Sequence, residues 1–169
     1  NINATDNWFC LVPGLTSSSY YMRLNTTDAE INNSGYPTIF ADSTTVSVRQ
    51  NSMGSWGNLI AYCFASVPGY SKVGSYVGNN NNIGPVVSTG FEPSFILIKA
   101  ISRTGYWIML DNKRNTSNPR DNPLYSNTTW AEDINQINRV NFDATGFQVV
   151  GTGGDVNASG HTYIYMTFA

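Results

Sequence analysis

The chain has 169 residues, a length that fits one ordinary domain or two small ones. Hydrophobic residues make up 41% of the sequence, which is enough for a core and argues against a disordered chain. Charged residues make up only 12%, and the net charge of −2 provides no basic face, so the composition argues against nucleic-acid binding.

The apolar residues follow the pattern of strands along the whole chain. Helical periodicity is almost absent, and apolar residues alternate or form short runs that end at Gly, Asn or Pro. These runs predict strands near residues 7–12, 20–24, 38–41, 45–49, 58–65, 73–77, 85–89, 94–101, 105–111, 123–126, 139–142, 146–150 and 161–168. Residues 112–123, polar and twice interrupted by proline, predict a surface loop. The sequence therefore predicts an all-β fold, an antiparallel β-sandwich of the jelly-roll or lectin-like kind.

No segment has the composition of a membrane span or of a secretion signal. The longest apolar run, residues 95–101, has the length of a strand, whereas a transmembrane helix needs about 20 apolar residues. Residues 1–8 contain neither the basic nor the apolar region of a signal peptide. We therefore expect no membrane insertion, and either a signal that was removed or a route other than secretion.

Two cysteines lie in apolar, strand-like runs, Cys10 in "WFCL" and Cys63 in "AYCF". Free cysteine in such a run behaves as a small hydrophobic residue, so buried thiols are the first expectation and a disulfide is the alternative. A zinc site needs more ligands than these two thiols and the single histidine, His161, provide.

Four blocks of sequence occur twice, in the same order and at nearly the same spacing. The blocks are "NWFCL" (7–11) and "YWIML" (106–110), "NTTDAE" (25–30) and "NTTWAE" (127–132), "TIFADSTTVSV" (38–48) and "VNFDATGFQV" (140–149, with one gap), and "NLIAYCFA" (58–65) and "HTYIYMTFA" (161–169). They align Trp8 with Trp107, Leu11 with Leu110, Asn25 with Asn127, Glu30 with Glu132, Phe40 with Phe142, Val48 with Val149, Ile60 with Ile164 and Phe64 with Phe168. We infer an internal duplication.

The duplication gives residues 1–66 as a first repeat, 67–73 as a linker and 74–169 as a second, complete repeat. The second repeat has strand-like segments ahead of Trp107 that have no counterpart ahead of Trp8, so the first repeat is incomplete. A β-sandwich without these strands has unpaired edges and an open core. Two interpretations follow: the chain is cut from a longer polypeptide, which we favour, or a neighbouring chain supplies the strands.

With these blocks in place, the sequence resembles a known family. The segments that carry the resemblance are "AYCFASVPGYSKVGSYVGN" (61–79), "GPVVSTGFEPSFILIK" (84–99), "YWIMLDNKR" (106–114) and "NASGHTYIYMTFA" (157–169). They are similar to a repeated β domain of uncharacterised function in tail-fibre-like and other virion structural proteins of tailed, largely short-tailed, aquatic bacteriophages. The resemblance extends from Trp8 to Ala169 and is specific in the order and spacing of its motifs.

This resemblance implies a non-enzymatic virion structural protein, a domain of a tail fibre or capsid appendage at the virion surface that contacts the host. It implies assembly with copies of itself, for which a trimer is the usual form in phage fibres, and with other virion proteins. It supplies no catalytic residues. Two alternatives stay open: a lectin-like module that binds host cell-surface glycan, and an extracellular filament subunit that is completed by strand exchange.

The neighbouring acids Asp28 and Glu30 suggest a glycosidase, which needs two carboxylates about 5–10 Å apart. The repeat argues against that role, because Glu30 recurs as Glu132 while Asp28 is replaced by Trp130. The retained Asn-Thr-Thr favours a structural turn that side-chain hydrogen bonds close. His161 opens the last predicted strand, in a turn that we expect to be exposed, and belongs to no recognisable nucleophile motif. We therefore predict no catalytic residues, and a glycan depolymerase is the weakest hypothesis.

The remaining loop acids are Asp111, Asp121, Asp143 and Asp155, and they do not form the alternating ladder of a calcium loop. The Gly-rich stretch "GTGGDVN" (151–157) is expected to lead from a strand into a turn, not into a helix, so it does not predict a phosphate-binding loop. The sequence predicts neither a metal site nor a cofactor.

The aromatic residues divide into two groups. Those that match between the repeats predict a repeated core: Trp8, Trp107, Phe40, Phe142, Phe64 and Phe168. Trp56, Trp130 and Tyr36 have no match and lie in polar turns. Such residues pack over the rim of a core, or they offer flat surfaces to sugars and protein partners. If the chain binds a ligand, these three residues are the predicted site.

Overall fold

In a computed structural model of the protein, the described residues are 7–32, 39–41, 44–48, 58–134 and 136–169. Their strands and helix, in chain order, are β1 (Phe9–Cys10), β2 (Tyr20–Arg23), β3 (Ile31–Asn32), β4 (Ile39–Ala41), β5 (Val46–Val48), β6 (Ser71–Val77), β7 (Val86–Ser88), β8 (Phe95–Ala100), β9 (Ile108–Asp111), β10 (Leu124–Tyr125), β11 (Val140–Asp143), β12 (Gly146–Val149), α1 (Gly154–Asn157) and β13 (Thr162–Phe168). Neighbouring strands run antiparallel, which confirms the predicted all-β fold.

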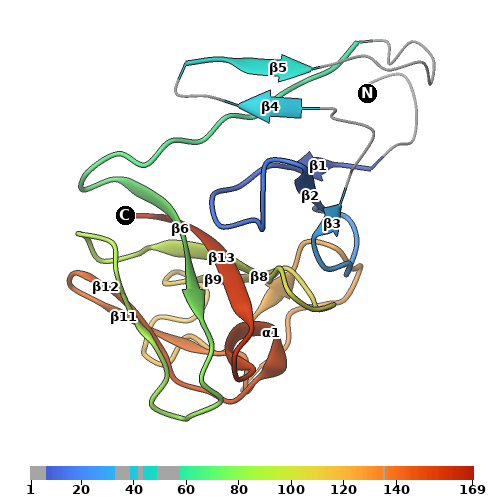
Figure 1. The fold of residues 1–169 in the computed structure, drawn as a ribbon. Coiled ribbons are helices and arrows are strands. Elements are labelled where there is room, and N and C mark those ends of the chain that lie inside the picture. Colours follow the sequence, from blue (N-terminus) through green and yellow to red (C-terminus); the bar gives the residue numbers. More distant parts are fainter. Residues whose placement is uncertain (1–6, 33–38, 42–43, 49–57, 135) are drawn as a thin grey trace.

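The largest sheet has the strand order β10-β9-β8-β13-β6 (Figure 1). β13 lies between β8 and β6, and Tyr165 at its centre is opposite Ile98 on one side and Gly74 on the other. A Cβ atom at Gly74 would lie 2.7 Å from the hydroxyl of Tyr165, so this position excludes larger residues. β13 is thus held by a ladder of hydrogen bonds along both of its edges.

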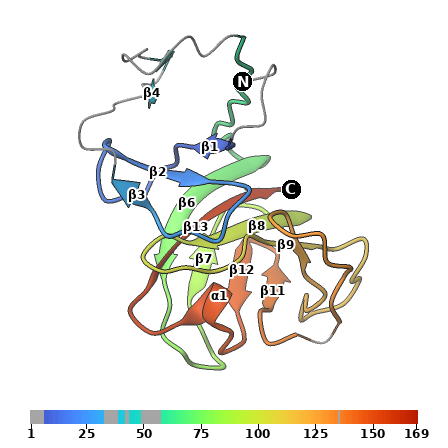
Figure 2. The same ribbon diagram turned by 90° about the vertical axis from the view of Figure 1, so that its right-hand side faces the viewer.

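The sheet β11-β12-β7 packs against one face of this sheet and makes the fold sandwich-like (Figure 2). Phe147 in β12 is fully buried, and its ring meets Tyr76 and Tyr165 edge-on, with 6.0 and 5.1 Å between ring centres. The buried core between the two sheets consists of Tyr76, Ile96, Ile98, Ala100, Ile108, Leu110, Tyr125, Val140, Phe142, Phe147, Val149, Val156, Tyr163 and Tyr165.

The sheet β1-β2-β3 lies over the other face of the five-stranded sheet (Figure 1). Successive residues of a strand point to opposite faces. Tyr163 and Tyr165 therefore belong to the sandwich core, while Ile164 between them packs with Met22 and Trp107 in a second buried cluster. β13 is buried on both faces because the early part of the chain covers it.

The hairpin β4–β5 pairs as the hairpin β11–β12 does. Phe40 is opposite Ser47, and Phe142, which aligns with Phe40 in the sequence, is opposite Phe147. This register places Val48 one position away from the residue with which the sequence aligns it. The two halves of the chain thus contain antiparallel hairpins at the same place in their order of elements, although the last pair before the turn is Ala41 with Val46 in the first and Asp143 with Gly146 in the second.

Residues 58–65 are not a strand, so the prediction there is wrong. They pair with no strand of the described chain, and every residue from 58 to 65 is exposed. Trp8 and Phe64, predicted as core, are 54% and 57% exposed. The sequence pattern of a buried strand is present, but a strand becomes buried only when neighbouring strands and a covering layer exist.

The cysteines are free, so the alternative of a disulfide is wrong. Cys10 is half-buried, and burial raises its pKa from 9.0 to about 11, although a hydrogen bond from the backbone of Leu24 acts in the opposite direction. Cys63 is exposed, so the prediction of buried thiols is wrong for this residue. Its exposure has the same cause as that of Phe64, the lack of strands beside residues 58–65.

Two short elements were not predicted. β3 has two residues and pairs with the first two residues of β2. The stretch predicted to turn after β12 forms the single helical turn α1, which starts after Gly153 without a side-chain cap. Both elements are too short to leave a periodic signal in the sequence. No helix in the described part of the chain has the length and apolar character that crossing a membrane requires.

Asn157 at the end of α1 is fully buried and ties two loops together. Its Oδ1 accepts the N–H of Asn79 at 2.9 Å, and its Nδ2 donates to the carbonyls of Asn81 and Gly151 at 2.9 and 2.7 Å. We expect Asn157→Ala to lower the free energy of unfolding by about 2–3 kcal/mol, because buried polar groups lose their partners. Urea unfolding measures this change, and the exposed Asn82→Ala is the control. Equal midpoints for both variants would contradict the prediction.

Candidate functional site

Of the three predicted ligand-binding residues, the structure places one. Trp130 lies against Tyr106 and Tyr125, with 5.0 and 5.6 Å between ring centres, and its side chain remains 53% exposed. Trp56 and Tyr36 lie outside the described residues and stay predictions. The site therefore consists of Trp130 and the two tyrosines beneath it, which the sequence did not single out.

Hydrogen bonds fix the two tyrosines. The hydroxyl of Tyr125 in β10 donates to Asp133 at 2.9 Å, and burial followed by this hydrogen bond raises the pKa of Tyr125. The backbone N–H of Tyr106 donates to Asp155 Oδ1 at 3.0 Å, which connects the residue to α1. The exposed indole of Trp130 thus rests on side chains that are held from two directions.

Charged groups border this aromatic cluster. Arg114, in the loop between β9 and β10, forms ion pairs with Asp111 at 2.6 Å and with Glu132 at 2.5 Å. Glu132 is two residues after Trp130, so the ion pairs hold the loop next to the indole. A flat apolar ring with carboxylate and guanidinium groups nearby has the chemistry that stacks on a sugar ring and bonds to its hydroxyls.

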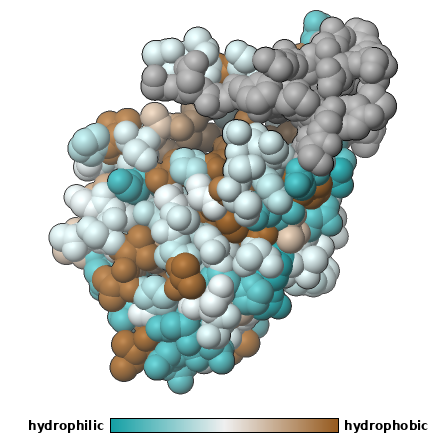
Figure 3. All heavy atoms as spheres, viewed as in Figure 1, coloured by the Kyte–Doolittle hydropathy of each residue, from teal (hydrophilic) through white to brown (hydrophobic). Residues whose placement is uncertain are grey.

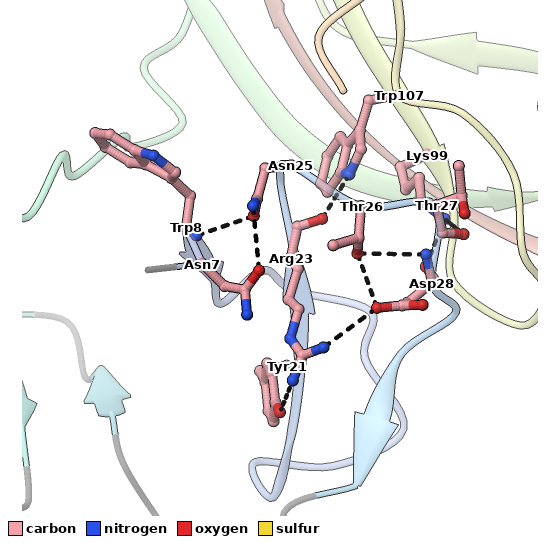
Figure 4. Close-up of polar contacts among 10 residues, drawn as sticks. All are labelled: Asn7, Trp8, Tyr21, Arg23, Asn25, Thr26, Thr27, Asp28, Lys99 and Trp107. Carbon is pink, nitrogen blue, oxygen red and sulfur yellow. Dashed lines mark hydrogen bonds and ion pairs between the residues drawn. The ribbon is translucent and has the colours of Figure 1, made fainter. Parts of the chain in front are cut away.

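The Asn-Thr-Thr turns of the two halves have the same geometry (Figure 4 shows the first). The Oδ1 atom of Asn25 accepts the N–H of Trp8 at 3.1 Å, and that of Asn127 accepts the N–H of Trp107 at the same distance. Each turn then bonds the hydroxyl of its first threonine to the backbone N–H two residues later, at 3.4 and 3.3 Å. In each half, the asparagine after one strand holds the residue that precedes the neighbouring strand, which is a structural role.

The two acids of the first turn are engaged separately. The carboxylate of Asp28 contacts Arg23 at 3.4 Å and accepts the hydroxyl of Thr26 at 2.9 Å (Figure 4). Glu30 accepts the backbone N–H of Thr16 at 2.8 Å and also its hydroxyl. Each carboxylate thus braces its own part of the loop. Among the described residues, no group of three or more His, Cys, Asp or Glu side chains is placed to hold a metal ion.

Lys99 in β8 is a buried cation that the sequence reasoning missed. Its side chain is fully buried, and its Nζ donates to the carbonyls of Asp28 (Figure 4) and Ala100, each at 2.8 Å. Burial lowers its pKa from 10.5 to about 8, while the charges of Asp155 and Asp28 oppose this shift. The lysine bonds the first turn to the five-stranded sheet. Its signal in the sequence was a lysine within the apolar run of residues 95–101.

His161 lies half-buried before β13, where it was predicted in an exposed turn. Its Nδ1 is 2.9 Å from the hydroxyl oxygen of Ser102, which also accepts the N–H of Thr162 at 3.1 Å. Within the described chain, no carboxylate forms an ion pair with His161. The contacts join the turn before β13 to the end of β8 and lack the third member of a catalytic triad.

Comparison with known proteins gives one match. A family model described as "Domain of unknown function (DUF7483)" matches residues 1–169, which is the whole sequence. None of the curated proteins and none of the solved structures matches the chain.

Proposed function

We propose that this chain, which belongs to the DUF7483 family of domains of unknown function, is a non-enzymatic structural domain of a bacteriophage virion. The proposal places it in a tail fibre or a capsid appendage, at the virion surface, where it contacts the host. The resemblance of its sequence blocks to repeated virion domains supports this role.

The observation that carries the proposal is the hairpin that occurs in both halves, each time held by a hydrogen bond from a tryptophan backbone N–H to an asparagine side chain. Trp8 and Asn25 form in the first half the contact that Trp107 and Asn127 form in the second. The sheet β1-β2-β3 of the first half packs on the sheet of the second half around Trp107, and Lys99 bonds the two together. Units that stack in this way lengthen a protein by simple addition, as repeat proteins do. Length built from like units is what an appendage requires.

The expected test is the location of the protein in the particle. Antibodies to the chain, applied to purified particles of the virus that encodes it, are expected to label an appendage or the capsid surface in electron microscopy. Mass spectrometry of the same particles is expected to contain its peptides in amounts that fit several copies per particle. A protein found only in the particle-free fraction of the lysate would overturn the proposal.

A second candidate function, glycan binding, is favoured by the exposed Trp130. Its indole contacts the rings of Tyr106 and Tyr125, and Glu132, two residues later in the chain, pairs with Arg114. This arrangement suits a sugar of the host cell surface, which a virion appendage meets first. The two functions are compatible, because a structural domain that presents such a ring acts as an attachment domain.

We expect Trp130→Ala to weaken glycan binding at least about tenfold, which corresponds to about 1.4 kcal/mol. The free energy of unfolding should change by less than about 1 kcal/mol, because half of the side chain is already in water. An array of bacterial surface glycans identifies the ligand, and calorimetry compares the variants. Trp8→Ala, which removes an equally exposed tryptophan, is the control. Binding that is absent, or equally strong in both variants, would contradict this function.

A further inference from the structure

Residues 58–65 present an unpaired, apolar segment to the solvent. The segment leads toward β6 without joining a sheet (Figure 1), and apolar residues reach the surface on this side of the molecule (Figure 3). Ile60, Tyr62 and Phe64 are 55%, 67% and 57% exposed. Within the described chain, no backbone N–H from Leu59 to Phe64 donates a hydrogen bond. Apolar side chains and free backbone donors together are the properties of a strand that lacks its neighbours.

The matching segment in the second half has the same pattern and the opposite environment. Residues 58–65 align with β13, where each residue from Tyr163 to Phe168 is opposite one residue of β6 and one of β8. Ile164 in β13 is 2% exposed, whereas its match Ile60 is 55% exposed. Thr167 is fully buried, whereas its match Cys63 is exposed. The presence of flanking strands accounts for the difference between the two segments.

The match between the halves rests on backbone geometry as well as on sequence. Trp8 and Asn25 make the same bond as Trp107 and Asn127, and the strands β1–β2 and β9–β10 pair in the same register relative to these residues. In the second half, β9 is followed across the sheet by β8, β13 and β6. In the first half, the place of β13 belongs to residues 58–65, and the places of β6 and β8 are the ones to be filled.

We propose that residues 58–65 are an acceptor strand, and that they bind two antiparallel strands of the β6 and β8 type from polypeptide that leads into β1. In the second half, β8 leads into the sequence block that contains Trp107, and the matching block of the first half contains Trp8. The donor strands are therefore expected to precede β1 in the polypeptide. A second copy of the chain is a poor donor, since its own β6 and β8 already pair with its β13. The proposal rests on the match between the halves and is independent of the virion role.

The acceptor strand has a smaller residue than β13 at one position, and this changes which residue fits opposite it on the donor strand. The ring of Tyr165 forces a glycine at Gly74 in β6, whereas the residue that matches Tyr165 in the acceptor is Ala61. A methyl group leaves space for a side chain on the neighbouring strand. The donor strand of the β6 type therefore accepts a larger residue at that position, and a β-branched one strengthens the pair.

The test is to supply the strands. A copy of residues 67–99 joined ahead of residue 1 of the whole chain keeps the spacing between a β8-type strand and the tryptophan block. Hydrogen exchange of the amides of residues 59–65 is expected to slow at least about a hundredfold relative to the chain alone. The control carries Phe95→Pro and Leu97→Pro in the added copy only, because the N–H groups of these residues face β13 in the complete sheet and proline removes the matching donors to the acceptor. Exchange that stays fast with the intact extension would overturn the proposal.

The thiol of Cys63 provides an independent measurement. With Cys10→Ser in every protein, labelling of Cys63 is expected to be fast in the chain alone and at least about tenfold slower with the intact extension, because reactivity follows exposure. Protection of β13 in every protein shows that the complete sheet is intact. Protected acceptor amides in the unextended chain, together with a dimer in sedimentation, would overturn the proposal by identifying a second copy as the occupant.

Discussion

Replacing Trp107 with alanine is expected to lower the free energy of unfolding by about 3–5 kcal/mol. The side chain is 3% exposed and packs with Met22 and Ile164 between two layers of sheet. Its Nε1–H also donates to the carbonyl of Arg23 at 2.9 Å, so alanine leaves a cavity and an unpaired carbonyl. The loss separates the sheet β1-β2-β3 from the rest of the protein as well as weakening the core.

The matched control is Trp8→Ala, which changes the same residue of the same sequence block. Trp8 is 54% exposed, and its ring meets the exposed Tyr62, so we expect a loss below about 1 kcal/mol. Trp107→Phe should lie between the two, because it keeps most of the volume and loses the hydrogen bond. Urea unfolding followed by circular dichroism measures all three variants. Equal losses for Trp8→Ala and Trp107→Ala would show that the two positions are equally packed and would contradict the described layers.

Lys99 is expected to make the protein more stable as the pH rises from about 8 to 10.5. In the unfolded chain its pKa is 10.5, and in the folded protein burial lowers it to about 8. Between these values the unfolded chain holds a proton that the folded protein has released, so the free energy of unfolding increases with pH. Over the full interval the gain is about 3 kcal/mol, at about 1.4 kcal/mol per pKa unit. Below pH 8 both states hold the proton and this contribution is constant.

The measurement compares the protein with Lys99→Met across this interval. The raised pKa values of Cys10 and of buried tyrosines such as Tyr163 act in the opposite direction, because the folded protein then keeps protons that the unfolded chain releases. Both proteins share these groups, so the difference between their unfolding curves isolates Lys99. Lys113→Met, which removes the same charge at an exposed position, is the control variant. A constant difference from pH 8 to 10.5 would refute the prediction.

The sequence predicted the all-β fold and most strands, because alternation of apolar residues reports the two faces of a strand. It failed where pairing decides the outcome. Residues 58–65 have the same alternation as β13, but a strand also requires neighbours, and these are a property of the whole fold. Trp8 and Trp107 show the same limit, since one block of sequence leads to one exposed and one buried ring.

The candidate site was predicted in part. Trp130 stood out because it broke the match with Asp28, and the structure places it in an aromatic cluster. Its support by Tyr106 was not predictable, since Tyr106 precedes β9 and Trp130 follows β10, and the two residues meet only when these strands pair. Lys99 was missed because a lysine in an apolar run predicts a solvent-exposed head group, whereas here three backbone carbonyls within 3.5 Å surround it.

The hydrogen bond from the tryptophan backbone N–H to the asparagine side chain forms across intervening segments of different length. Trp8 and Asn25 are 17 residues apart, while Trp107 and Asn127 are 20 apart, yet the bond between them has the same length. The hairpin loop therefore absorbs extra residues without shifting the strands. Ser18, exposed in the turn that leads into β2, is accordingly a place to insert a foreign peptide. Under the proposed virion role, such an insertion would display the peptide at the particle surface.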